Sequence, residues 1–367
     1  MSMLSLLEAS KRKTHEVTEL KVYQEPFNVK DILQYNNLET LVIEDTEVEM
    51  IEENIFYLKG LKNLSILNNT RLESVFIPEN CTSNIYSLNL SRNSLNIIPK
   101  NLNKFINLKR LNLEKNKIYK WDKGIFELEL EYLNLGDNRL IDVPESILNL
   151  TSLYSLVLKN NKIRSLNLFF KNDAYLRNLF LSDNQIEDFC ISDKAFQLES
   201  LFLDANDINS VPETIKQLKS LKLLSFYNNP EIRTLPDWIF EALPNLCELN
   251  FSAIGLQKIS EKVSKLSKLY KLDLSDNKLK DIPDSLYQLE ELKFLNISAN
   301  DLTEISDKIN NLSSIRRLDA SLNSLKNFPE IDNKNMEFID LSANAMHEET
   351  KNKLREYFAA YPIKFFV

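Results

Sequence analysis

The sequence predicts an α/β solenoid, a right-handed horseshoe with a parallel β-sheet on its concave side and short helical or 3-10 segments returning along its convex side. Two observations lead to this fold class. The apolar pattern L-x-x-L-x-L-x-x-N-x-L recurs fifteen times between Val17 and Met346 of a 367-residue chain. Three copies then continue with a proline and an acid, a pair typical of the start of a helical turn. They are the segments 143–150, 211–218 and 282–289.

The spacing of one asparagine per copy sets the register of the pattern. Neighbouring asparagines are separated by 22 to 24 residues, with two exceptions. The last two are separated by 21 residues, and the interval from Asn229 to Asn277 is about twice the usual length. Glu25, Thr46 and Ile254 stand in the asparagine position of the other three copies, and the sequence leaves open whether these three are regular coils. The twelve asparagines are Asn69, Asn93, Asn116, Asn138, Asn161, Asn184, Asn206, Asn229, Asn277, Asn300, Asn323 and Asn344.

This pattern resembles the leucine-rich repeat family, specifically the class with roughly 23 residues per repeat that is found in bacterial and intracellular proteins. The resemblance covers residues 17–346. One repeat cannot bury its leucines alone, so successive strands should pair in parallel and merge their apolar positions into one core. The asparagine amide is expected to bond the backbone of its own turn and of the adjacent coil, as in the family. These asparagines are therefore expected to be structural.

The segments outside the repeats are predicted to cap the solenoid, which gives three parts. Residues 1–16 should form an N-terminal helical cap, and residues 17–346 the repeats. Residues 347–367 should form a C-terminal cap, with a helix from His347 that stops near Pro362 and a final strand. Such a strand would cover an exposed sheet edge.

Charge and cysteine content limit the partners and the compartment. The net charge of -8 disfavours nucleic acid and anionic membranes as partners and tolerates basic ones. No run of 18 apolar residues occurs, so membrane insertion is not expected. The three cysteines, Cys81, Cys190 and Cys247, are far apart and odd in number, which argues against a disulfide framework. We expect a cytoplasmic protein. The alternative is a secreted or surface-associated protein without a recognisable signal peptide.

Residues suited to catalysis are sparse and scattered. The two histidines, His15 and His347, belong to opposite predicted caps and cannot share a site. The four glycines form no phosphate-binding loop, and no cysteine has a candidate base near it in the sequence. We therefore expect a non-enzymatic protein with no cofactor and no metal ion.

The predicted register places an unusual aromatic group on the concave face, because positions three, five and seven of each copy point away from the core. Phe180 and Phe202 both take position five in adjacent copies and should lie side by side. An exposed apolar patch of this kind commonly marks an interaction site. An alternative is that the two rings stack only to stabilise the sheet. The predicted partner-binding residues are Tyr132, Val157, Phe180, Phe202, Asp204, Leu223 and Tyr227.

The C-terminal third carries a second predicted patch, which is acidic and aromatic. Its acids take position five and its phenylalanines position three, and Lys271 and Arg317 partly neutralise the acids. These acids suit a basic partner, for which they would mainly steer association. The residues of this patch are Asp273, Phe294, Asp319, Phe338 and Asp340.

The predicted function is a protein interaction module that binds a protein or peptide, possibly a basic one, on its concave face. One alternative is an inhibitor or sequestering protein, by resemblance to horseshoe inhibitors that engulf basic enzymes. Alternatives of a different class are a glycan-acting enzyme that uses the C-terminal acids and a surface adhesin. The sequence leaves the oligomeric state open, and a monomer is favoured.

Overall fold

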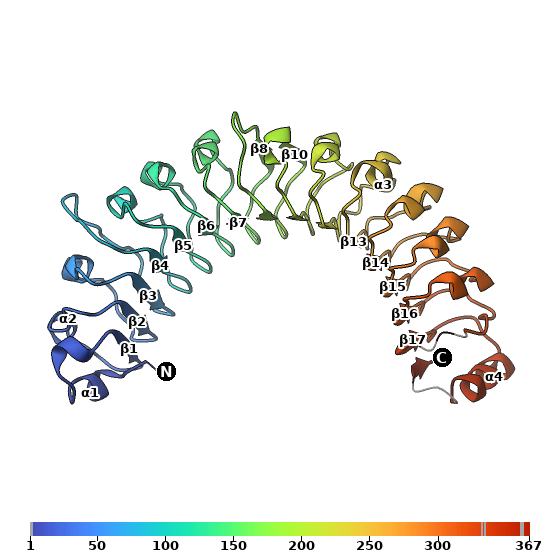
Figure 1. The fold of residues 1–367 in the computed structure, drawn as a ribbon, viewed down its shortest axis with the longest axis horizontal. Coiled ribbons are helices and arrows are strands. Elements are labelled where there is room, and N and C mark those ends of the chain that lie inside the picture. The colour runs from blue at the N-terminus through green and yellow to red at the C-terminus, as the bar shows by residue number, and fades with distance from the viewer. Residues whose placement is uncertain (1–2, 332, 334, 360–362) are drawn as a thin grey trace. The chain divides into compact units, whose positions relative to one another are not determined.

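A computed structural model describes residues 3–331, 333, 335–359 and 363–367. The chain divides into two compact units, Met1–Phe180 and Leu181–Val367. In each unit the repeat contributes one short strand and a return that is mostly helical or extended loop (Figure 1). The predicted class, an α/β solenoid with parallel strands and short helical or 3-10 returns, is confirmed.

In the first unit, eight strands form a parallel ladder in the order β1-β2-β3-β4-β5-β6-β7-β9. These strands are β1 Glu19–Tyr23, β2 Thr40–Glu44, β3 Asn63–Leu67, β4 Ser87–Asn89, β5 Arg110–Asn112, β6 Tyr132–Asn134, β7 Ser155–Val157 and β9 Asn178–Phe180. The other elements are α1 Leu6–Ala9, η1 Thr14–Glu16, α2 Val29–Leu33, η2 Glu53–Tyr57, η3 Leu102–Lys104, η4 Lys123–Glu127, η5 Glu145–Asn149 and β8 Ser165–Leu168.

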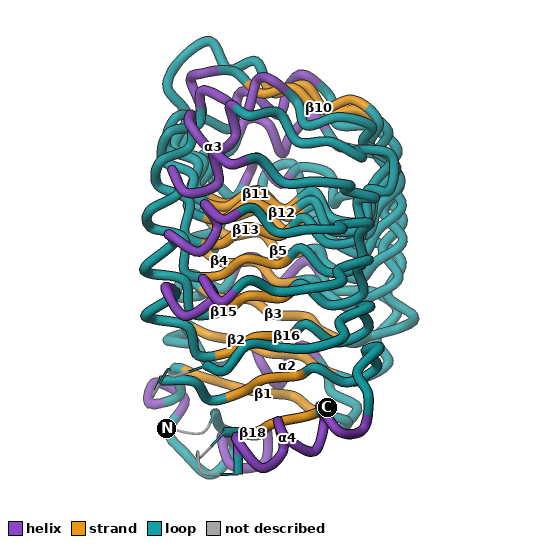
Figure 2. The backbone as a smooth tube through the Cα atoms, turned by 90° about the vertical axis from the view of Figure 1, so that its right-hand side faces the viewer, coloured by secondary structure: helices purple, strands orange, loops and turns teal. Residues whose placement is uncertain are grey.

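In the second unit, eight strands follow one another from β11 to β18, again in parallel (Figure 2). They are β11 Ser200–Phe202, β12 Leu223–Ser225, β13 Glu248–Asn250, β14 Lys271–Asp273, β15 Phe294–Asn296, β16 Arg317–Asp319, β17 Phe338–Asp340 and β18 Lys364–Phe366. The other elements are β10 Asp188–Ile191, η6 Asp193–Ala195, η7 Glu213–Gln217, α3 Trp238–Ala242, η8 Glu261–Lys265, η9 Asp284–Gln288, η10 Asp307–Asn311 and α4 Glu348–Phe358.

The strands alternate between core and surface as the repeat pattern requires. In β14, for example, Leu272 is buried while its neighbours Lys271 and Asp273 are not. The central residues of neighbouring strands pair with each other, so the leucines form a continuous buried row in each unit. Each such leucine contributes about 1.5–3 kcal/mol when it is fully buried. Positions three and five therefore form the strand face, which is the surface available to a partner.

The repeat asparagines are satisfied by the backbone, as predicted. Asn138 donates from Nδ2 to the carbonyl oxygens of Leu135 in its own coil and Leu113 in the preceding coil, both at 3.0 Å. Its Oδ1 accepts from the Ile118 N–H at 3.0 Å. Asn161 and Asn300 make the equivalent bonds. In each of these coils a buried asparagine amide therefore links the coil to the preceding coil.

The three copies without asparagine are regular at the level of the strand. The copies around Glu25, Thr46 and Ile254 contribute β1, β2 and β13, each in register with its neighbours. Ile254 is buried, and its N–H bonds to Oδ1 of Asn277 in the next coil at 3.2 Å. The neighbouring asparagine thus supports the turn that lacks its own amide.

The turn before each asparagine uses a left-handed backbone conformation that the sequence pattern did not reveal. The residue just before each of the twelve asparagines varies in type, yet its φ is positive throughout. Even Leu322, a large aliphatic residue, has a φ of 54°. Non-glycine residues rarely adopt this conformation, so the surrounding hydrogen bonds impose it.

The helical returns begin where the proline and acid pairs predict. η5, η7 and η9 start directly after Pro144, Pro212 and Pro283, and each has an acid in its first turn. The acid is favoured there because the first N–H groups of a helix carry partial positive charge. The short returns are therefore encoded locally.

The helices α1 and α4 lie at the two ends of the chain, and the C-terminal end also carries a final strand. Ser5 and Glu8 form a capping box at the start of α1. At the other end, α4 ends at Phe358, and Phe358 and Phe365 of β18 lie with ring centroids 4.5 Å apart. Pro362, where the helix was expected to stop, lies outside the described residues.

Candidate functional site

The strand face of the second unit presents two rows of side chains of different character. The row at position three alternates charge and aromatic ring, because Lys271 pairs with Phe294, Phe294 with Arg317, and Arg317 with Phe338. The row at position five is acidic and polar, and it runs through Asp273, Asn296, Asp319 and Asp340. Cations and acids therefore flank opposite sides of the same buried leucine row.

A shallow hollow of about 330 Å³ lies between these two rows. We call it the strand-face hollow. Its volume falls at the lower end of the range for ligand sites, and its floor is the buried leucine row. It is lined by Lys271, Leu272, Asp273, Phe294, Leu295, Asn296, Arg317, Asp319 and Phe338. Four of the five residues of the second predicted patch line it, and Asp340 pairs with Asp319 in the next strand.

Contacts within the rows hold the charged and aromatic groups in place. The Arg317 guanidinium lies 5.2 Å from the centroid of the Phe338 ring, within the range of a cation–π interaction. Phe338 also lies 5.7 Å from the ring of Phe366. Lys271 forms an ion pair with Glu248 at 3.6 Å. The aromatic groups of the hollow are thus partly ordered before any partner binds.

The acids of the hollow form hydrogen bonds that stabilise the turns after their strands. Asp273 Oδ1 accepts from the Ser275 N–H at 3.0 Å and from its hydroxyl at 2.6 Å. Asp319 makes the same pair of bonds with Ser321. Such local bonds to the residue two positions ahead are typical of Asp in turns. These hydrogen bonds explain the presence of the two acids without a catalytic role. The carboxylates still leave the outer edge of the row negatively charged.

The aromatic patch predicted from Phe180 and Phe202 is divided between the two units. In the first unit, Tyr132 and Phe180 are half-buried on the strand face, and Arg110 lies 5.1 Å over the Tyr132 ring. Val157 is only 8% exposed, so it offers little surface to a partner. Its short side chain lies in a row between Asn134 and Phe180, and these larger neighbours flank it.

The rest of the patch belongs to the second unit. Phe202 and Leu223 are half-buried, and Tyr227 is 46% exposed. All three lie at outward-facing positions of β11 and β12 or just after β12. The contact expected between Phe180 and Phe202 stays a prediction.

Asp204, one of the predicted partner-binding residues, forms hydrogen bonds with two neighbouring coils. It accepts hydrogen bonds from the Ser225 hydroxyl, from the Tyr227 N–H at 2.9 Å and from the Ser182 hydroxyl at 3.2 Å. Burial raises the pKa of this carboxyl, although the hydrogen bonds act in the opposite direction. Asp204 thus ties three neighbouring coils together.

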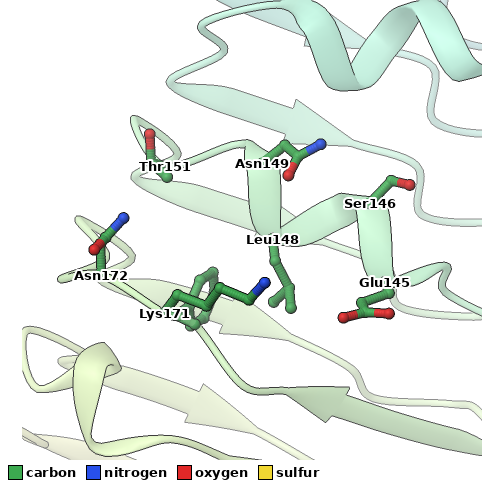
Figure 3. Close-up of a pocket in the computed structure, with 8 residues that line it drawn as sticks. Glu145, Ser146, Leu148, Asn149, Thr151, Lys171 and Asn172 are labelled. Carbon is green, nitrogen blue, oxygen red and sulfur yellow. The ribbon is translucent and has the colours of Figure 1, made fainter.

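A second hollow, of about 430 Å³, lies in the first unit away from the strand face (Figure 3). It lies between η5 and the loop after β8, where Lys171 and Glu145 face the same space. The sequence pattern did not indicate it, because the regular apolar spacing of that copy does not reveal that β8 stands where most copies have a helical return. Its lining mixes two amides, two hydroxyls and one charge of each sign, so it favours no particular chemistry.

The described residues contain no candidate metal site and no candidate membrane span. No group of three or more His, Cys, Asp and Glu side chains there could hold a metal ion. Across the same part of the chain, none of the helices has the length and apolar character needed to cross a bilayer.

Comparisons with known proteins converge on one family. A family model described as "Leucine rich repeat" matches residues 106–163 and 244–302. The chain is 32% identical over 244 residues to osteomodulin of Bos taurus, an alignment that covers 58% of this chain and 57% of osteomodulin. The chain thus spans about half the length of curated relatives that it matches.

Two solved structures are similar in fold. A leucine-rich repeat protein of Leptospira interrogans is 24% identical, with a TM-score of 0.66 over 100% of both chains. A TLR13–ssRNA13 complex is 20% identical, with a TM-score of 0.64 over 98% of this chain and 63% of that one. The fold alone therefore does not exclude a nucleic-acid partner, and the exclusion expected from the net charge is not supported.

Proposed function

Since the chain is a leucine-rich repeat protein, we propose that it binds a partner protein or peptide through its strand face. The fold is a general protein-interaction module, because stacked repeats present an extended, regular surface. The observation that carries the proposal is the strand-face hollow, where half-exposed phenylalanines alternate with cations. Aromatic residues and arginine are the side chains that most often anchor interfaces.

The structure of the hollow supports a partner that offers both an apolar group and charge. An apolar side chain of the partner would pack against Phe294 and Phe338, whose rings remain half-exposed. A basic group of the partner would meet the row of Asp319 and Asp340. Among the described residues, no hydrogen bond reaches the second carboxylate oxygen of either acid. A basic partner is therefore part of the proposal.

The aromatic residues predicted from the sequence extend the same proposal. Phe202, Leu223 and Tyr227 lie on the strand face of the second unit, as the hollow does, and Tyr132 and Phe180 lie on that of the first. We propose that each of these two groups is a further partner contact on the strand face of its own unit. Val157 is left out of the contact set because it is buried.

The inhibitor alternative differs from this proposal in its energetics. A sequestering protein for a basic enzyme would depend mainly on the acidic row, and salt would weaken such binding strongly because the Debye length is about 8 Å at physiological ionic strength. Binding that rests on Phe294 and Phe338 would depend on salt much less. A titration of affinity against salt concentration separates the two.

We further propose that the protein is not an enzyme. The acids that a glycan-acting enzyme would use are bonded to turn serines, as described for Asp273 and Asp319. A screen of polysaccharides with Asp273→Asn and Asp319→Asn tests the point. Hydrolysis by the wild type that both variants lose would establish the enzyme instead.

The compartment is also a matter of proposal. The cytoplasmic location expected from the cysteines finds no support among the relatives, and the secreted or surface-associated alternative fits them better. We propose that alternative. Fractionation of the native cells tests it, since recovery of the protein only with the cytoplasm would contradict it.

The binding proposal is tested by double variants, each of which removes two aromatic rings. In Phe294→Ala with Phe338→Ala, two rings of the hollow are removed, and partners captured from source extract by the wild type should be lost. The matched control is Phe169→Ala with Tyr175→Ala, two exposed rings outside the strands. Equal capture by both double variants would refute the assigned face. A third double variant, Phe180→Ala with Phe202→Ala, tests the predicted aromatic patch in the same assay.

A further inference from the structure

One repeat of the second unit carries an excess of positive charge. Residues 256–280 contain seven lysines and three acids, although the chain as a whole has a net charge of -8. This segment is therefore a local positive region on an acidic protein. Local charge of this kind concentrates ligands of opposite sign whatever the net charge of the molecule.

The basic repeat contributes to a hollow of about 890 Å³ on the segments that follow the strands β12 to β15. We call it the lysine hollow. Its volume is within the range of small-molecule sites, and it is larger than the strand-face hollow. Five cations line it against three acids, Asp237, Glu261 and Asp301. The cations are Arg233, Lys258, Lys262, Lys278 and Lys280.

The cations of the lysine hollow fall into two groups. Lys262 is already neutralised, since its ammonium lies 2.9 Å from Glu241 and 3.3 Å from Asp237. Arg233 pairs with Glu231 at 2.8 Å. By contrast, no ion pair to Lys258, Lys278 or Lys280 occurs within the part of the chain that the structure describes. These three ammonium groups are available to an anion.

Backbone hydrogen bonds fix the segments that carry Arg233 and Lys278 to the segment between them. Arg233 N–H donates to the Ile254 carbonyl at 3.0 Å, and Lys278 N–H donates to the Leu256 carbonyl at 2.8 Å. Gly255, with φ of 72°, lies between them. A Cβ at this position would lie 3.2 Å from the Pro230 carbonyl oxygen and 3.7 Å from Arg233 Cγ. The glycine therefore permits the close approach that sets the position of Arg233 at the edge of the hollow.

We propose that the lysine hollow binds a small soluble anion that carries more than one negative charge, of the phosphate-ester or polyphosphate type. Lysine ammonium groups act as compact charges with several donors, which suits the many acceptor oxygens of such a group. A singly charged carboxylate would leave two of the three lysines without a partner. The site is separate from the strand-face hollow, and no residue lines both.

The test is binding of inorganic pyrophosphate to the full chain, followed by calorimetry and by the rise in melting temperature that a ligand of the native state produces. The site variant is Lys258→Gln with Lys278→Gln and Lys280→Gln. Pyrophosphate should bind the site variant about tenfold more weakly than the wild type, because each exposed ion pair contributes a factor of up to about five. Sodium acetate at the same ionic strength should not compete.

The matched control makes the same change in net charge elsewhere in the second unit. Lys216, Lys326 and Lys364 are exposed and do not line the hollow. Their triple substitution by Gln should leave pyrophosphate affinity within about twofold of the wild type, since charges beyond a Debye length are screened. Circular dichroism of both triple variants shows that each is folded.

Three outcomes would overturn the proposal. One is the absence of pyrophosphate binding by the wild type, and another is equal weakening in the two triple variants, which would indicate general charge attraction. The third is binding only to phosphatidylcholine vesicles that contain phosphatidic acid, which would assign the lysines to a lipid surface. None of these outcomes bears on the strand face, so the two proposals fail independently.

Discussion

Replacing one repeat asparagine tests the structural account of the solenoid. Asn138 is 8% exposed and makes four hydrogen bonds to the backbone. In Asn138→Ala the carbonyls of Leu113, Leu135 and Gly136 each retain another donor, from Asn116, Asn161 and Lys115. The Ile118 N–H loses the one acceptor found for it among the described residues.

The expected loss of stability in Asn138→Ala follows because the three carbonyl acceptors keep a donor, whereas the Ile118 N–H donor loses its acceptor. A buried N–H without a partner costs about 1–3 kcal/mol, whereas a carbonyl that keeps one donor loses much less. We therefore expect Asn138→Ala to lower the free energy of unfolding by about 2–3 kcal/mol. The matched control is Asn149→Ala, in which an exposed amide with no side-chain hydrogen bond in the described structure is removed. It should change stability by less than about 0.5 kcal/mol.

The assay combines urea denaturation, followed by circular dichroism, with hydrogen exchange of the peptide that contains Ile118. The exchange measurement is needed because a long repeat array need not unfold in one step. In Asn138→Ala the Ile118 amide should exchange faster than in the wild type, while amides near Asn300 should be unchanged. The reasoning is refuted if Asn138→Ala and Asn149→Ala have the same stability and the same exchange.

Three further predictions concern single side chains. Leu322 is 59% exposed and has φ of 54°, so Leu322→Asn should raise the free energy of unfolding by about 1 kcal/mol, and an unchanged urea midpoint would contradict the strain. Burial raises the pKa of Asp204 above its ordinary 3.8, so the stability contributed by its neutral form is present below pH 3.8 and lost as pH rises through the folded-state pKa. The side chain of Asp204→Asn cannot ionise, so the melting temperature of this variant minus that of the wild type should increase from pH 3.5 to pH 7. If this difference stays constant with pH, the raised pKa is refuted. Burial also raises the pKa of the Cys81 thiol, which is 4% exposed, so a thiol reagent at pH 8 should modify Cys81 after Cys190 and Cys247; simultaneous loss of all three thiols would count against that burial.

The register of the solenoid was predictable because two independent signals agree on it. The alternation around Leu272 places Lys271 and Asp273 on the surface, and the asparagine at a fixed distance identifies the turn. The strand-face hollow follows from the same register, since its rows are positions three and five of successive copies. A regular repeat therefore allows surface residues to be assigned from the sequence.

The features that sequence reasoning missed depend on contacts between neighbouring coils. The sequence indicated Asp204 only as a partner contact and did not reveal its hydroxyl donors, Ser182 and Ser225, which are 22 and 21 residues away. Val157 is buried because of the size of its neighbours in the row. The left-handed turn residues include Leu322, whose own preference opposes that conformation. In each case the decisive group lies in another repeat or in the backbone.

The central claim, that the strand face binds a partner protein or peptide, is tested most directly by photo-crosslinking from single positions. A photoreactive phenylalanine analogue is introduced at Phe294 in the strand-face hollow, or at Phe169, which is 54% exposed on the loop after β8. The account predicts crosslinks to a partner polypeptide from position 294 and none from position 169. Crosslinks from position 169 alone would contradict it.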